Sequence, residues 1–161
     1  AKRLGLVVGA EENMADRTEN LVKIYGADEV VKMSPIRTMI DAGIIVGMEG
    51  LGNTRLDDEG NEKTPLWYIE MFVRRTDLKT GKVWNESERV TREQALQMST
   101  IWAAYYLKDE DTLGSIEVGK LADFVILNGD YMTVPEDKIS DLKAIMTVID
   151  GKVFYEVPGQ F

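Results

Sequence analysis

Two short runs of apolar residues constrain the fold of this chain more than any other sequence feature. Leu4 to Val8 (LGLVV) and Ile44 to Met48 (IIVGM) contain only apolar residues and glycine, and each is followed by small or acidic residues. Continuous runs of this kind fit strands that are buried on both faces, as in parallel sheets. Parallel strands need a crossover, and a helical segment lies between the two runs. The runs therefore predict an α/β fold.

Helix signals surround these runs. Four segments begin with a Ser or Thr that can cap a first turn, in two of them directly before proline: they start at Thr18, Ser34, Thr64 and Thr91. Gly26 is placed to end the first of these helices. Gln94 completes a capping box for the last, which is expected to continue to about Leu107. On this last helix Ala95, Met98, Trp102 and Tyr105 or Tyr106 recur at helical spacing, which favours core packing.

The pattern changes near Lys108 to Thr112. After Gly114 four short runs are typical of strands separated by turns: Ser115 to Val118, Phe124 to Leu127, Ala144 to Ile149 and Lys152 to Val157. Asp150-Gly151 is a dipeptide favoured in tight hairpins. We therefore expect an α/β segment over residues 1–110 and a β-rich module over residues 111–161.

Composition limits the chemistry of the chain. Its 161 residues include no His and no Cys, which supply most transition-metal ligands and many nucleophile or base pairs. The sequence itself thus assigns no metal ligand. A net charge of −9 opposes binding to nucleic acid or to an anionic membrane. No apolar stretch approaches the roughly 20 residues that span a bilayer, so we expect a cytoplasmic protein.

Glu49 is the candidate catalytic residue, because it follows the second apolar run. In α/β enzymes catalytic groups gather at the carboxyl ends of strands. The alternative for Glu49 is an ordinary loop acid or a local hydrogen-bond acceptor. The other acidic clusters, Glu11-Glu12, Asp57 to Glu59 and Asp109 to Asp111, fit solvated loop surfaces.

Arginines on two predicted helices offer a second possibility for chemistry. Arg37 and the pair Arg74-Arg75 could bind a carboxylate or hold the long polar loop of residues 51–63. On helices, arginines more often form structural ion pairs.

Three segments then point to a known family. They read TREQALQMSTIWAAYYL, LGSIEVGKLADFVIL and IMTVIDGKVFYE, and they resemble the C-terminal end of amidohydrolase-superfamily enzymes of the amidohydrolase family 3 type. That family has an EAL-x-x-x-T-x-x-A helix, a G-x-x-x-x-GK-x-AD strand motif and a closing G-K-V-x-Y strand. Here these correspond to Gln94 to Ala104, Gly114 to Leu127 and Gly151 to Tyr155. Upstream, SPIRTMIDAGIIVGM is similar to the helix that enters the last barrel strand of the family.

The resemblance implies an architecture. Residues 1–110 would form the last strands and helices of a (β/α)8 barrel, and residues 111–161 the C-terminal strands of a small composite β-sandwich. A barrel of this type takes about 250 residues, so the fold is expected to be incomplete in this chain. The chain would then be the C-terminal part of a larger hydrolase.

The resemblance also implies a reaction, the hydrolysis of an amide or related C–N bond in a small molecule by metal-activated water. The divalent, zinc-type metal would be held largely by residues upstream of Ala1, and this chain alone is expected to be inactive. Family members carry G-S-D near the end of the last strand, and its Asp receives the proton of the water. Here Gly47 to Leu51 stands in its place, with Leu51 or a neighbour at the Asp position and Glu49 as the substitute.

Two other functions stay open. A non-catalytic α/β association domain would use exposed apolar edges to bind the missing N-terminal part of the barrel or a second copy of itself. A metal-free hydrolase that relies on carboxylates would need Glu49.

Overall fold

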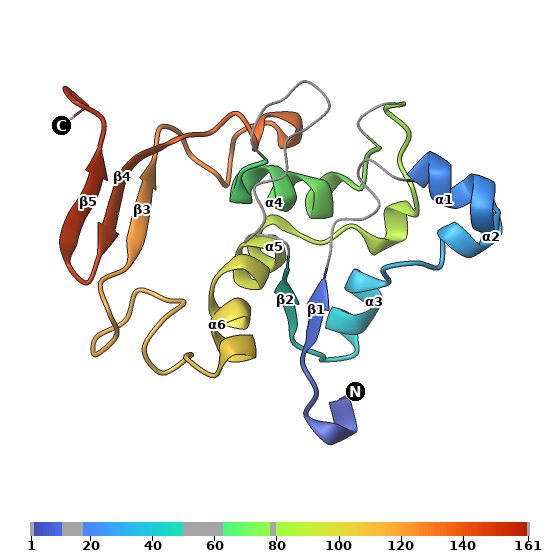
Figure 1. Cartoon of the computed structure of the whole chain (residues 1–161), viewed down its shortest axis with the longest axis horizontal. Coiled ribbons are helices and arrows are strands. Elements are labelled where there is room, and N and C mark those ends of the chain that lie inside the picture. Colours follow the sequence, from blue (N-terminus) through green and yellow to red (C-terminus); the bar gives the residue numbers. More distant parts are fainter. Residues whose placement is uncertain (1, 11–17, 50–62, 78–79, 161) are drawn as a thin grey trace.

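The computed structural model describes residues 2–10, 18–49, 63–77 and 80–160, and in it two separate sheets are joined through a helical middle (Figure 1). The α-helices are α1 (Thr18–Tyr25), α2 (Ala27–Val30), α3 (Ile36–Asp41), α4 (Pro65–Arg74), α5 (Arg92–Ser99) and α6 (Ile101–Leu107). The strands are β1 (Val8–Ala10), β2 (Val46–Met48), β3 (Phe124–Leu127), β4 (Ala144–Ile149) and β5 (Lys152–Glu156). Short 3-10 helices are η1 (Lys2–Leu4), η2 (Glu86–Glu88) and η3 (Glu136–Lys138).

The first sheet is the predicted parallel pair. Strands β1 and β2 pair in parallel, with Gly9 opposite Gly47 and Ala10 opposite Met48. The α/β prediction is therefore confirmed. The predicted start of the first strand is wrong, because residues 2–4 form η1 and Gly5, at φ +62°, donates its N–H to the carbonyl of Lys2 at 3.0 Å. This turn delays the extended conformation until Val8.

Helix α1 follows the prediction, since it runs from Thr18 and stops before Gly26, whose φ is +83°. The start of α3 differs from the prediction. Ser34 does not cap the helix and lies at φ +52°, while Pro35 precedes the first helical residue, Ile36. The reason is tertiary, because the buried Arg75 guanidinium donates to the carbonyl of Ser34 at 3.1 Å.

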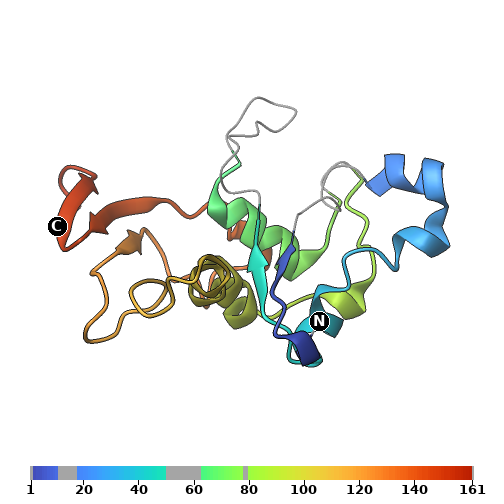
Figure 2. The ribbon, with the colours of Figure 1, turned by 60° about the horizontal axis from the view of Figure 1, so that its bottom comes forward.

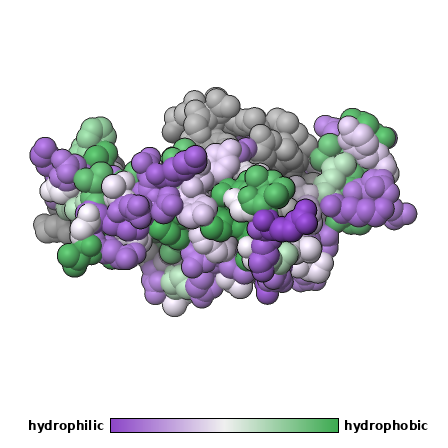
Figure 3. Space-filling view, turned by 90° about the horizontal axis from the view of Figure 1, so that it is seen from below, coloured by the Kyte–Doolittle hydropathy of each residue, from purple (hydrophilic) through white to green (hydrophobic). Residues whose placement is uncertain are grey.

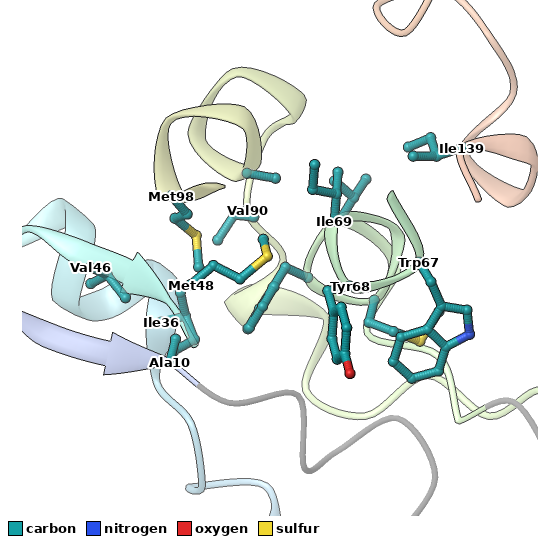
Figure 4. Packing of buried hydrophobic residues seen from close by; sticks show 14 of the residues in the cluster. Ala10, Ile36, Val46, Met48, Trp67, Tyr68, Ile69, Val90, Met98 and Ile139 are labelled. Atoms are coloured by element: carbon teal, nitrogen blue, oxygen red, sulfur yellow. The ribbon is translucent and has the colours of Figure 1, made fainter. Parts of the chain in front are cut away.

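Helix α4 forms the centre of the core, and every residue from Trp67 to Val73 is buried. Its predicted start is confirmed, since the Thr64 hydroxyl accepts from the N–H of Trp67 at 3.3 Å. Figure 4 shows Met48 of β2 and Met98 of α5 pointing toward one another within this core. The parallel sheet is thus packed against α4 and α5.

The predicted helix from Thr91 to about Leu107 is confirmed at its start and wrong in its length. Thr91 and Gln94 form the capping box, but the helix breaks at Thr100, whose φ is −125° and ψ −99°. The hydroxyls of Ser99 and Thr100 both donate to the carbonyl of Leu96, at 2.9 and 2.7 Å. The N–H of Thr100 bonds instead to Gln97. Such side-chain bonds to the preceding turn bend helices.

The second sheet is antiparallel, in the order β3-β4-β5. Its hairpin turn is the predicted one, with Asp150 at φ +50° and Gly151 at φ +70°. Asp123 accepts from the N–H of Asp150 at 2.7 Å and so ties β3 to this turn. The predicted strand at Ser115 to Val118 is wrong, because this exposed segment belongs to a loop that Lys120 closes by donating to the carbonyls of Glu110 and Leu113.

A connecting segment joins the second sheet to the core. Tyr131, Ile139 and Leu142 belong to the same buried cluster as α4 and α5. Arg92 of α5 donates to the carbonyls of Tyr131 and Val134, and the Tyr131 hydroxyl donates back to the carbonyl of Arg92 at 2.8 Å. The backbone N–H of Ser140 donates to the buried Glu70 at 2.9 Å. The division into residues 1–110 and 111–161 stays a prediction.

The second sheet itself lies at one end of the molecule, with α1 and α2 at the other end (Figures 1 and 2). Figure 3 shows hydrophobic residues at the surface of the end formed by the second sheet. Among the described residues, no helix combines the length and the apolar character needed to cross a membrane.

Candidate active-site carboxylate

Glu49 lies directly after β2, at the carboxyl end of the parallel sheet. Its backbone N–H donates to the carbonyl of Ala10, the last residue of β1, at 2.8 Å. This bond continues the ladder one residue past the strand, so Glu49 is held at a defined position. Because β1 and β2 are parallel, their carboxyl ends meet at the same edge, and the half-buried Glu49 lies at this edge.

Gly9 makes room for the Glu49 side chain. A Cβ atom added to Gly9 would lie 1.7 Å from Oε1 of Glu49, so the carboxylate occupies the space that any other residue at position 9 would fill. Glycine in a strand often marks such a close approach. The only sign of this close approach in the sequence is the glycine that directly follows the apolar run Leu4 to Val8.

Tyr106 of α6 lies beside the carboxylate, because its Cβ lies over Gly47, the register partner of Gly9. The neighbouring Glu49 carboxylate, as a hydrogen-bond acceptor and as a negative charge, raises the pKa of Tyr106 above its ordinary value. The sequence assigned Tyr105 or Tyr106 to core packing, but both are exposed, with 41% and 47% of their surface accessible. That assignment is wrong because the break at Thr100 turns α6 out of the line of α5.

The arginines considered from sequence have structural contacts. Arg37 pairs with Asp41 one turn along α3, with Nε and Oδ1 2.8 Å apart, and Arg74 pairs with Glu70 at 2.5 Å on α4. Arg75 is buried and donates to the carbonyl of Trp84 at 3.1 Å. Burial lowers the pKa of Arg75. The contacts of Arg37 and Arg74 match the ion-pair alternative, whereas Arg75 is bound by backbone carbonyls.

The acidic clusters are only partly described. Glu11-Glu12 and Asp57 to Glu59 lie outside the described residues, as do Gly50 and Leu51 beside Glu49. In Asp109 to Asp111 the two aspartates are exposed, as predicted, whereas Glu110 between them is half-buried, so the prediction of a solvated acid is wrong for that residue.

A metal site needs several ligand side chains held close together. Within the described ranges, His, Cys, Asp and Glu side chains form no group of three or more that could hold a metal ion. Glu49 offers one carboxylate, which by itself does not make a metal site. The described residues therefore do not provide a metal-binding set of their own.

Comparison with known proteins decides the family. The sequence model described as "Amidohydrolase family" matches residues 1–155. The chain belongs to the amidohydrolase family. The resemblance found in the motifs from Gln94 to Tyr155 is thereby confirmed.

Similar proteins of the amidohydrolase family are much longer than this chain. An N-substituted formamide deformylase from Arthrobacter pascens is 30% identical over 131 residues, which are 81% of this chain and 23% of that protein. An imidazolonepropionase from Bacteroides thetaiotaomicron is 28% identical over 144 residues, 80% of this chain and 34% of that protein. The chain thus spans about a quarter to a third of the length of these relatives.

Solved structures agree on the fold. A prolidase crystallised with N-methylphosphonate-L-proline matches with a TM-score of 0.56 and 18% identity, over 97% of this chain and 36% of the prolidase. A mutant atrazine chlorohydrolase from Arthrobacter aurescens TC1, crystallised with zinc and atraton, matches with a TM-score of 0.52 and 23% identity, over 93% of this chain and 35% of that protein.

Proposed function

We propose that this amidohydrolase-family chain is the C-terminal part of a metal-dependent enzyme that hydrolyses an amide-type C–N bond in a small molecule. The family match supports the reaction class, and the deformylase is a relative named for such a bond. The small share of each relative that the chain spans supports its being part of a longer protein.

The same proposal assigns places to the two sheets. Residues 1–110, with strands β1 and β2 and helices α1 to α6, would be the last elements of a (β/α)8 barrel. Residues 111–161, with β3 to β5, would be part of a composite β-sandwich. The parallel pairing of β1 and β2 and the antiparallel order β3-β4-β5 support this assignment.

The observation that carries the function is the position of Glu49. A carboxylate at the carboxyl end of a parallel strand is placed where enzymes of this architecture carry out chemistry. We assign Glu49 the role of the base that accepts a proton from the attacking water. A divalent metal, zinc in the related chlorohydrolase structure, would be bound by the remainder of the protein and would activate that water.

The experiment uses the full-length protein with a panel of N-formyl amines, dipeptides and cyclic amides as substrates. Glu49→Gln keeps the size of the side chain and removes the base, so kcat should fall by about 10²- to 10⁴-fold. Glu136→Gln, at an exposed position of η3, is the matched control and should keep the activity of the unaltered protein. Wild-type turnover in a folded Glu49→Gln variant would refute the assignment.

The second candidate, an association domain, is favoured by the exposed apolar residues of the C-terminal sheet. Phe154 is 78% exposed, and Val125 and Val153 are more than half exposed. Surfaces of this kind usually bind a partner. The missing upstream part of the polypeptide is the partner we propose, and a second copy of the chain is the alternative.

Two measurements separate these cases. The intact mass of the natural gene product should be well above 18.1 kDa if an upstream part exists. Size-exclusion chromatography with light scattering should find the 161-residue chain associated, because its sheet is uncovered. A stable monomer of the chain would argue against the association domain. We expect the chain alone to be inactive in either case.

A further inference from the structure

We propose that Tyr106 is a positioning residue, whose phenol holds the Glu49 carboxylate in one orientation at the carboxyl end of β2. This inference rests on the function proposed for Glu49 and extends it to a residue on a separate helix. Three features of the structure support it: the pair of glycines on one face of the parallel sheet, the packing of α6 on that face, and the contacts that fix the first turn of α6.

The first feature is the pair of glycines on one face of the parallel sheet. Gly9 and Gly47 are direct partners in the register of β1 and β2. Since side chains alternate along a strand, Glu49 extends from the same face as Gly47 two residues earlier. The Glu49 side chain lies across Gly9, where an added Cβ would meet its Oε1, carboxyl carbon and Cγ within 2.7 Å. The glycine pair thus leaves the carboxylate lying flat on the sheet.

The second feature is the helix that covers the other glycine. A Cβ added to Gly47 would lie 3.4 Å from Cβ of Tyr106 and 3.5 Å from the carbonyl oxygen of Trp102. The α6 backbone therefore lies directly on Gly47, which fixes the base of the Tyr106 side chain two residues from Glu49. From there the phenol can donate to the carboxylate that lies across the neighbouring Gly9, and the pKa of Tyr106, which Glu49 raises, agrees with such a bond. Glu49 is held between the sheet and this tyrosine.

The third feature fixes where α6 begins. Gly114 packs so closely on the first turn that an added Cβ would lie 2.7 Å from Cα of Ile101 and 2.8 Å from Cβ of Ala104. On the other side, the hydroxyl of Thr100 is bonded to Leu96. The helix cannot slide along the sheet without breaking these contacts, so Tyr106 returns to the same position.

These contacts matter chemically because a base must face the water that it deprotonates. A carboxylate has two oxygens with about four acceptor positions, and one phenol donor is enough to select its rotation. Misplacing a catalytic group by about 1 Å can cost roughly 10²-fold in rate. A partial loss is expected when the donor is removed but the sheet still supports the carboxylate.

The test is a double-mutant cycle in the full-length enzyme. Tyr106→Phe removes only the hydroxyl and should lower kcat about 10-fold, with KM changed less than about twofold. Tyr105→Phe is the matched control, because it removes a hydroxyl with a similar exposure from the same helix, and it should leave kcat unchanged. In a Glu49→Gln background, Tyr106→Phe should have no further effect, since a positioning residue acts only through the base.

A second readout does not depend on activity. The NMR chemical shift of the Tyr106 ring should change in Glu49→Gln, whereas the signal of the buried Tyr131 should not. An unchanged Tyr106 signal overturns the inference. So does a normal kcat of Tyr106→Phe when Glu49→Gln is inactive, and in that case the proposed function stands. If Glu49→Gln is fully active, the proposed function falls, and the inference falls with it.

Discussion

At the scale of single residues, two glycines with crowded surroundings should respond differently to the same substitution. The Cβ of Gly9→Ala would meet the end of the flexible Glu49 side chain, which can move away. The Cβ of Gly114→Ala would meet the backbone of α6. Gly114 also has a φ of +85°, a conformation that alanine rarely adopts. We expect Gly114→Ala to lower the free energy of unfolding by about 1–3 kcal/mol. Gly9→Ala should lower the free energy of unfolding by less than that and should instead lower kcat of the proposed full-length enzyme. Urea denaturation and kinetics measure the two effects, and equal losses of stability would contradict this contrast.

The buried Tyr131 predicts a pH dependence. Burial raises its pKa to about 12, above the ordinary value of 10. The folded state therefore binds the phenol proton more tightly than the unfolded state does. The stability that the neutral phenol contributes is complete below pH 10 and is lost as the pH rises toward 12. The loss should be on the order of 2 kcal/mol. Tyr131→Phe should remove that part of the pH dependence, whereas Tyr155→Phe, at an exposed position, should not. If the free energy of unfolding depends on pH in the same way in Tyr131→Phe and in the unaltered chain, this prediction is contradicted.

At the scale of elements, local capping should set the stability of α5. The Thr91 hydroxyl accepts from the N–H of Gln94 at 3.2 Å, and the Gln94 side chain accepts from the N–H of Thr91 at 2.9 Å. Thr91→Ala should lower the free energy of unfolding by about 1 kcal/mol. Thr91→Ser keeps the hydroxyl and should cost much less. Denaturant midpoints compare the variants, and equal midpoints for the two would show that the cap is unimportant.

The same elements show what could be predicted from sequence and why. Caps at Thr64 and Thr91 and the turn at Asp150-Gly151 were predictable because both partners lie within a few residues. The later start of α3, after Ser34 and Pro35, could not be predicted, because Arg75, which bonds to the carbonyl of Ser34, is 41 residues away in the sequence. The placement of Tyr106 beside Glu49 could not be predicted either, since it depends on the break at Thr100 and on a sheet face formed by glycines. Glu49 could be singled out by its place after an apolar run, but its neighbours required the tertiary structure.

At the scale of the whole molecule, the C-terminal sheet provides a test of whether the proposed longer protein covers its exposed residues. In the 161-residue chain Phe154 is 78% exposed, so Phe154→Ser should change its stability by no more than about 0.5 kcal/mol. In a full-length protein that covers this sheet, the same change should cost about 3 kcal/mol. Ile24→Ser, at the 69% exposed position on α1, is the control and should be neutral in both. Small losses in both proteins would mean that the sheet stays open.

The attachment of residues 131–142 to α4 and α5 has a consequence for a chain that is cut by a protease. The arginine of α5 and the acid of α4 hold this segment through backbone groups, and Ile139 is completely buried beside them. The loop around Val118, by contrast, is fully open to a protease. A cut there should leave two peptides that migrate together under native conditions and separate only in denaturant. If so, the two halves could be produced separately and mixed to reconstitute the fold.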